Sequence, residues 1–140
     1  MEWKVMVLRL ILAVTFVVNI FLGVVALSSE SLVLKVAEMI YGVKLAGLEQ
    51  HTLYIIKMMG CFIIALAVMA GLAVKDPLHN KAIVYGTGLW LVLRGLQRAM
   101  YVGQFHQDWG ISYGVLWGQV VFVLLVGITL FVLVPLSEKR

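Results

Sequence analysis

The sequence predicts an all-α polytopic membrane protein, an antiparallel bundle of four transmembrane helices with a short amphipathic outer-surface helix in its first loop. Hydrophobic residues make up 63% of the chain and charged residues only 13%. The apolar residues gather in four runs of about 20 residues, the length that a helix needs to cross a hydrocarbon core of about 30 Å. Residues 1–140 are therefore expected to form a single membrane domain.

The predicted spans cover about residues 5–27, 52–74, 82–102 and 111–134. The first run is longer than the apolar core of a secretory signal peptide, so we expect it to remain as a span. The second and third connections, VKDPLHNK and GQFHQDWG, are short and contain turn-forming residues. Neighbouring spans should therefore run antiparallel and lie side by side.

The first connection, residues 28–51, is the only long one, and apolar residues recur in it at helical spacing. These residues are Leu32, Val36, Met39, Ile40 and Val43. Ser29 is a suitable N-cap and Gly42 a suitable C-terminal residue. The pattern predicts a short amphipathic helix that lies on the outer membrane surface and covers the bundle.

Basic residues indicate the orientation of the chain in the membrane. Most of them lie on one side of the predicted spans: Lys4, Arg9, Lys75, Lys81, Lys139 and Arg140. Lys35 and Lys44 fall in the long first connection, where glutamates oppose them. The positive-inside rule then places both termini in the cytoplasm. Orientation accounts for the net charge of +4 without a nucleic-acid partner.

Positive charges inside the predicted spans are the most informative feature of the sequence. Lys57, Arg94 and Arg98 fall within spans, whereas none of the seven acidic residues does. Lys57 and Arg98 lie close to the outer ends of their spans, where a long side chain reaches the membrane surface. Arg94 lies deeper, and an unpaired arginine near the bilayer centre costs about 2.5 to 3.5 kcal/mol or more.

Depth in the membrane suggests partners for Arg94. Asn19, Arg94 and Gln119 each lie about eight residues from the outer end of a span, so they should share one layer. In one interpretation, the two amides hydrogen-bond Arg94 and fix the register of the bundle. In the other, an acceptor completes the site: a lipid phosphate, a quinone carbonyl, a partner's carboxylate, or Glu49 or Asp108 reaching inward.

Small residues predict where helices approach closely. Gly110, Gly114 and Gly118 recur at four-residue intervals before and within the last span. Gly60 and Gly95 are the corresponding positions in the second and third spans. The glycine stripe of the last span can face its own bundle or another chain.

Cofactor and catalytic motifs are few. His51 and His106 should both lie near the outer surface, and such a pair could ligate haem, although His106 falls in a polar turn. A lone cysteine, Cys61, excludes disulfide-exchange chemistry. The sequence has no paired carboxylates, HExxH motif or phosphate-binding glycine loop. It therefore predicts no metal site and a non-catalytic role, with bound lipid or quinone as the expected ligand.

The long first connection, the glycines of the second span, the KDPLHNK turn and the LRGLQR segment resemble the DoxX-like group of small four-helix bacterial membrane proteins. The resemblance implies an accessory membrane component linked to quinone or redox systems. It assigns no catalytic residue to any position of this chain.

The sequence predicts an accessory or structural subunit of a larger bacterial inner-membrane complex. Its expected binding residues are Asn19, Lys57, Arg94, Arg98 and Gln119. Membrane lipid and either other membrane subunits or further copies of this chain are the expected partners. A quinone-linked or haem-containing redox protein is the alternative. A small transporter would require an oligomer, because four helices leave little room for a pathway.

Overall fold

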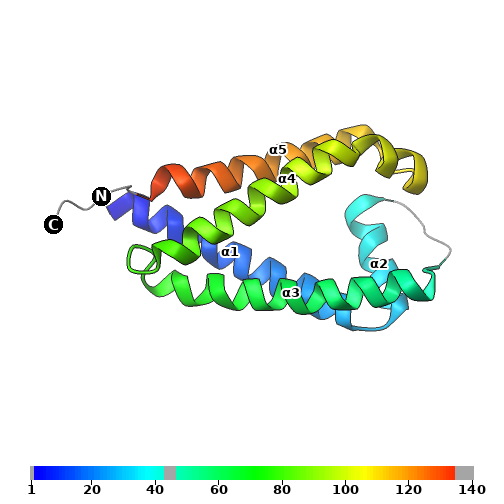
Figure 1. Cartoon of the computed structure of the whole chain (residues 1–140), viewed down its shortest axis with the longest axis horizontal. Helices are drawn as coiled ribbons and strands as arrows, with labels where there is room; N and C mark the ends of the chain where they lie inside the picture. The colour runs from blue at the N-terminus through cyan, green and yellow to red at the C-terminus, as the bar shows by residue number, and fades with distance from the viewer. Residues whose placement is uncertain (1, 43–46, 135–140) are drawn as a thin grey trace.

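The structure is a computed structural model that describes residues 2–42 and 47–134, and all of its regular elements are helices (Figure 1). In chain order these are α1 (Glu2–Leu27), α2 (Glu30–Tyr41), α3 (Gln50–Lys75), α4 (Lys81–Trp109) and α5 (Tyr113–Leu133). The predicted all-α class is confirmed. Val43, Lys44, Lys139 and Arg140, which entered the predictions above, lie outside the described residues.

Among the described helices, α1, α3 and α5 are long and apolar enough to cross a membrane. Their ends agree with the predicted spans to within three residues. The helix α4 is the longest, at 29 residues, but it carries more polar side chains than the other three.

The end of α4 differs from the prediction. Residues 103–109 continue the helix, so an outer turn over 103–110 is wrong. Phe105 and Trp109 pack against the buried residues Val102, Ile111 and Leu116, and this packing keeps the polar segment helical. Gly110 ends the helix in the left-handed region at φ 66°, and Ser112 caps α5 by accepting from the Val115 N–H.

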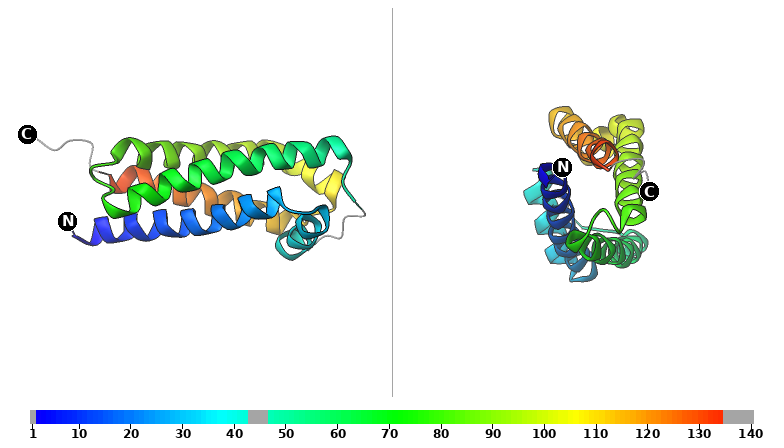
Figure 2. Two further views of the ribbon diagram at one scale, coloured as in Figure 1. Left: turned by 90° about the horizontal axis from the view of Figure 1, so that it is seen from below. Right: turned by 90° about the vertical axis from the view of Figure 1, so that its left-hand side faces the viewer.

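The four long helices form two antiparallel pairs. The helix α1 packs along α3, and α4 packs along α5, whereas contacts between the pairs are far fewer. The expectation that every consecutive pair lies side by side is therefore wrong for α3 and α4. Figure 1 shows the pairs converging where α1 begins and α5 ends, and diverging toward α2, and the end-on view in Figure 2 shows α1 beside α3 and α4 beside α5. We call these two ends the terminal end and the α2 end.

Glycines allow the close approach within each pair. A Cβ atom added at Gly60 of α3 would lie 3.1 Å from the Gly23 carbonyl oxygen of α1. Between α4 and α5, a Cβ at Gly127 would lie 3.0 Å from the Gly88 carbonyl oxygen. Both distances are shorter than ordinary van der Waals contact, so only glycine fits without a shift of the helices.

The terminal end holds the larger hydrophobic core. All four long helices contribute buried residues to it: Leu8, Leu12, Ala70, Ala73, Val84, Leu91, Leu130, Leu133 and Val134, the last just after α5. At the same end, Arg9 Nη2 donates to the Lys75 carbonyl oxygen at 2.8 Å, satisfying a carbonyl of the last turn of α3. In the turn that follows, Asp76 Oδ1 accepts from the His79 N–H at 3.0 Å.

The predicted helix of the first connection is confirmed as α2, which follows Ser29 and ends at Gly42 with φ 71°. Its inward face differs from the predicted stripe, because Met39 is 71% exposed. The residues that line the interior are Val33, Val36, Ala37, Ile40 and Tyr41. The helix therefore lies over the open α2 end with its aliphatic residues toward the space between the pairs.

Candidate functional site

A cavity of about 890 Å³ lies between the two helix pairs, and all five helices contribute to its lining. Most of the lining side chains are aliphatic or aromatic. The polar ones, counting tyrosine and tryptophan, are Thr15, Asn19, Tyr41, Trp90, Arg94, Arg98 and Gln119. A mainly apolar cavity of this size with a few polar groups is typical of a site for a small organic molecule.

The cavity opens to the side between α1 and α5. Val18 and Phe21 of α1 line it and are 46% and 50% exposed, and Phe122 of α5 lines it and is 66% exposed. These two helices make few contacts with each other. A molecule bound in the cavity would therefore be partly exposed, through this opening, to the medium outside the protein.

Arg98 is held in place by two side chains from different helices. Its Nη1 donates to Gln119 Oε1 of α5, and its Nη2 donates to the Tyr41 hydroxyl of α2 at 2.9 Å. The Arg98 guanidinium carbon also lies 5.9 Å from the centre of the Tyr41 ring. Arg98 thus connects α4, α5 and α2, and is no free anchor at the surface.

The interpretation in which Gln119 hydrogen-bonds Arg94 is therefore wrong. Gln119 bonds Arg98 instead, one helical turn later on α4. The contacts of Gly88 with Gly127 and of Gly95 with Leu124 set the register between α4 and α5. In this register Gln119 faces Arg98. The prediction measured depth from residue 102, whereas α4 continues to Trp109.

Arg94 lies one turn earlier on α4, and the structure gives it no acceptor. Its guanidinium carbon lies 5.4 Å from the centre of the Trp90 ring. Over residues 2–42 and 47–134, no oxygen accepts a hydrogen bond from Arg94, and no carboxylate lines the cavity. In the same ranges no fully buried side-chain nitrogen lacks a partner, so the Arg94 nitrogens are accessible from the cavity.

Asn19 lines the same cavity from α1. Its Nδ2 donates to the Thr15 carbonyl oxygen at 2.7 Å, within the same helix, and not to Arg94. The residue is 6% exposed, and its Oδ1 remains accessible from the cavity. Asn19, Arg94 and Gln119 therefore share one cavity, as their depth suggests, but do not bond to one another.

The remaining predicted residues lie away from this cavity or serve the fold. Lys57 is exposed on α3 and does not line the cavity. Gly60 and Gly95 lie at helix contacts, where an added Cβ would meet Ala26 and Leu124. A Cβ added at Gly110, Gly114 or Gly118 would meet no described atom within 4 Å. These three glycines pack against no described part of this chain.

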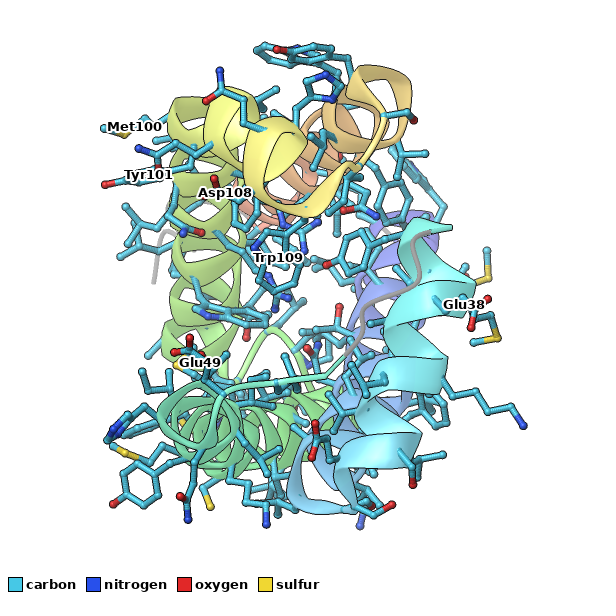
Figure 3. All side chains as sticks on the ribbon, turned by 90° about the vertical axis from the view of Figure 1, so that its right-hand side faces the viewer. Glu38, Glu49, Met100, Tyr101, Asp108 and Trp109 are labelled. Carbon is cyan, nitrogen blue, oxygen red and sulfur yellow. The ribbon has the colours of Figure 1, made fainter. Side chains whose placement is uncertain are left out.

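The histidines and acidic residues take other roles. His51 is exposed in the first turn of α3, and His106 Nδ1 lies 2.8 Å from the Ile111 carbonyl oxygen, where it helps to close the α4–α5 turn. The described residues include no cluster of three or more His, Cys, Asp or Glu side chains that could hold a metal. Glu49, the residue before α3, and Asp108 of α4 are both exposed at the α2 end (Figure 3).

Tyr41 is a site residue that sequence reasoning did not identify. It lines the large cavity and also a smaller one of about 120 Å³, together with Arg98, Phe105, Trp109, Ile111 and Leu116. The Tyr41–Arg98 pair thus separates the two cavities. Figure 3 shows Trp109 near the middle of the α2 end. The available signal was that Tyr41 follows Ala37 by one turn on the apolar side of α2.

Comparison of the chain with protein families, curated proteins and solved structures gives no match, so the resemblance to the DoxX-like group stays a prediction.

Proposed function

We propose that this chain is a multi-pass protein of a bacterial inner membrane, crossed by α1, α3, α4 and α5, with both termini in the cytoplasm. The lengths and apolarity of α1, α3 and α5 support the proposal. The helix α4 runs from the terminal end to the α2 end alongside α5. If α5 crosses the membrane, α4 crosses it too. At about 1.5 Å per residue, its 29 residues exceed the thickness of the hydrocarbon core.

In this proposal the chain binds a membrane amphiphile in the cavity, as a non-catalytic accessory subunit of a larger membrane complex. The observation that carries it is the accessible Arg94 guanidinium, which has no acceptor among the described residues, in a mainly apolar cavity that opens between α1 and α5. An unpaired arginine at this depth is costly, and the head of an amphiphile would supply its missing acceptor. The apolar part of the same molecule would fill the rest of the cavity.

The lining residues suit binding better than catalysis. Among the described residues they include no Cys, His, Asp or Glu, the side chains that most often serve as nucleophiles or proton-transfer groups. Large hydrophobic side chains are exposed on all four long helices, which fits contact with lipid and with other membrane subunits.

Extraction of the native protein tests the proposal. The full chain is purified in mild detergent, and lipids and quinones are extracted and identified by mass spectrometry. We expect one enriched amphiphile in the natural protein and in Lys57→Gln, and its loss from Arg94→Gln. Lys57 is the matched control because it is a cation on a long helix outside the cavity.

Three results would count against the proposal or change it. Absence of any enriched amphiphile would refute it, as would equal amounts in Arg94→Gln and Lys57→Gln. An enriched quinone with a redox-active spectrum would replace the accessory role by a quinone-linked redox function.

A further inference from the structure

We infer that the head recognised in the cavity is the phosphate group of an anionic membrane lipid. The inference rests on the proposed binding of an amphiphile and specifies its chemical class. It follows from the charge of the lining, from the donors that remain unused there, and from the side opening between α1 and α5.

The lining carries a net positive charge that the described part of the chain does not neutralise. Arg94 and Arg98 each carry a positive charge, and no aspartate or glutamate among the described residues lines the cavity. The two acceptors of Arg98, Gln119 and Tyr41, are neutral. A neutral carbonyl, such as that of a quinone, would give Arg94 a hydrogen bond but would leave both charges uncompensated. An anionic head supplies the acceptor and the counter-charge together.

The groups left over near Arg94 are mostly donors. Gln119 uses its Oε1 to accept from Arg98, which leaves its amide N–H groups. The Tyr41 oxygen also accepts from Arg98, which leaves its own O–H to donate. The Trp90 indole nitrogen can only donate. Phosphate oxygens accept without donating, so they match this set. Asn19 Oδ1 is an accessible acceptor on the opposite helix and suits a hydroxyl of the lipid head.

The position of the arginines suits a phosphate held in the cavity. Arg94 and Arg98 lie four residues apart on α4 and both line it, so their side chains project from one face of the helix. Arg98 uses only two of its five N–H groups in the bonds to Gln119 and Tyr41. One phosphate can therefore be chelated by Arg94 while Arg98 contributes a further donor.

The apolar walls give the lipid chains a path. Val14 and Val18 of α1 and Phe122 of α5 line the cavity and are about half exposed or more. Chains that follow these residues would leave the cavity between α1 and α5 and continue among the surrounding lipids. A free phosphate ion would use the arginines and leave this apolar wall empty.

Binding of two lipids that differ only in the head tests the inference. The full-length protein in mild detergent is titrated with phosphatidylglycerol or phosphatidylcholine of identical acyl chains, and bound lipid is counted by native mass spectrometry. We expect about tenfold or more tighter binding of phosphatidylglycerol, because both heads carry the phosphate but the quaternary ammonium of phosphatidylcholine cancels its charge and leaves the two arginines uncompensated. Arg94→Gln should abolish the preference, and Lys57→Gln should keep it.

A second pair of variants tests the chain path independently of the head. Val18→Trp fills the wall of the cavity, whereas Val17→Trp adds the same bulk to an exposed position of α1 that does not line it. We expect Val18→Trp to weaken binding of both lipids and Val17→Trp to weaken neither. Thermal unfolding of each variant verifies that it is folded.

The outcomes separate this inference from the proposed function. Equal binding of the two lipids, or a preference that persists in Arg94→Gln, would overturn the anionic head; loss of binding in Val18→Trp would still support an amphiphile site. Binding of inorganic phosphate, but of neither lipid, would overturn the lipid. Absence of any lipid binding to the natural protein would overturn both.

Discussion

Two arginines one helical turn apart have different environments in this molecule. Arg98 donates to Gln119 and Tyr41 and so joins three helices, whereas Arg94 lies over the ring of Trp90, has no hydrogen-bond acceptor among the described residues and is accessible from the cavity. Arg98 thus contributes to the structure, and Arg94 is available to a ligand. The difference follows from the register of α4 against α5 and from the position of α2.

Replacement of Tyr41 by phenylalanine tests the structural role of Arg98. The variant keeps the ring but removes the oxygen that accepts from Arg98 Nη2. We expect a loss of about 1 to 3 kcal/mol in unfolding free energy, because a partly buried charged donor loses its acceptor. A fall of several degrees in the melting temperature in detergent would report it. Tyr54→Phe, at a position 65% exposed on α3, should melt unchanged. Equal melting temperatures in the two variants would contradict the prediction.

The sequence singled out four of the polar residues that line the cavity, but not their hydrogen bonds. Asn19, Arg94, Arg98 and Gln119 were selected because polar side chains are rare in apolar helices, and all four line the cavity. Hydrogen-bond partners depend on the register of one helix against another, which the periodicity of either helix alone does not determine. The part played by Tyr41 depends on where α2 packs, and its short amphipathic pattern does not contain that information.

At the scale of the helices, glycine determines the spacing within each pair. Gly23 meets Gly60 between α1 and α3, and Gly88 meets Gly127 between α4 and α5. The sequence predicted close packing through glycine, but a Cβ added at any position of the most regular stripe, Gly110, Gly114 and Gly118, would meet no described atom within 4 Å. Regular spacing alone does not reveal which face of a helix has a neighbour.

Alanine at two glycines of α5 should have opposite effects. In Gly127→Ala the new Cβ would lie 2.9 Å from Val92 Cγ2 and 3.0 Å from the Gly88 carbonyl oxygen, which forces α4 and α5 apart. We expect a loss of about 1 to 3 kcal/mol. Gly118→Ala meets nothing within 4 Å and should be neutral or stabilising, by up to about 1 kcal/mol, because alanine favours the helix. Thermal unfolding in detergent compares the two, and a larger loss in Gly118→Ala would be inconsistent with this packing.

The segment 103–109 explains the largest error in the predicted helix ends. Its glycine and polar residues are typical of a turn, yet it is helical because Phe105 and Trp109 pack against the start of α5. Tertiary contacts override local preference here. Where the length of the apolar run determines the helix ends, as in α1, α3 and α5, the predicted ends are accurate to a few residues.

At the scale of the whole molecule, buried apolar contacts are concentrated at the terminal end. Leu8 and Leu12 of α1 are fully buried there with residues of the three other long helices. The second buried cluster joins only α4, α5 and their turn, with Tyr41 packed against it. The cavity lies between the pairs where such contacts are missing.

Truncation of Leu12 should therefore be costly. Leu12→Ala removes a fully buried side chain from the core that joins both pairs, and we expect a loss of about 2 to 5 kcal/mol. Val17→Ala, at a position 62% exposed on the same helix, should cost less than about 1 kcal/mol. Unfolding in detergent, followed by circular dichroism, measures both. Similar losses would show that the terminal core does not hold the pairs together.

Reporter fusions test the proposed crossing of the membrane. With four spans, a green fluorescent protein joined to the C-terminus should fluoresce in the cytoplasm, and alkaline phosphatase fused after Gly110 should be active in the periplasm. Phosphatase fused after Asp76, in the α3–α4 turn, should be inactive and serves as the control. An active phosphatase at the C-terminus would exclude this topology.

The hydrophobic core at the terminal end joins the two helix pairs, so the pairs would pivot about this end. Both helix pairs extend away from this end. At about 1.5 Å per residue, Arg94 lies about 20 Å along α4 from its first residue. If one helix pair rotated by a few degrees relative to the other, the distances among Leu12, Ala73 and Leu133 would barely change. The same rotation would widen the cavity between Asn19 and Gln119, so the proposed lipid site could change in width while the terminal core stays intact.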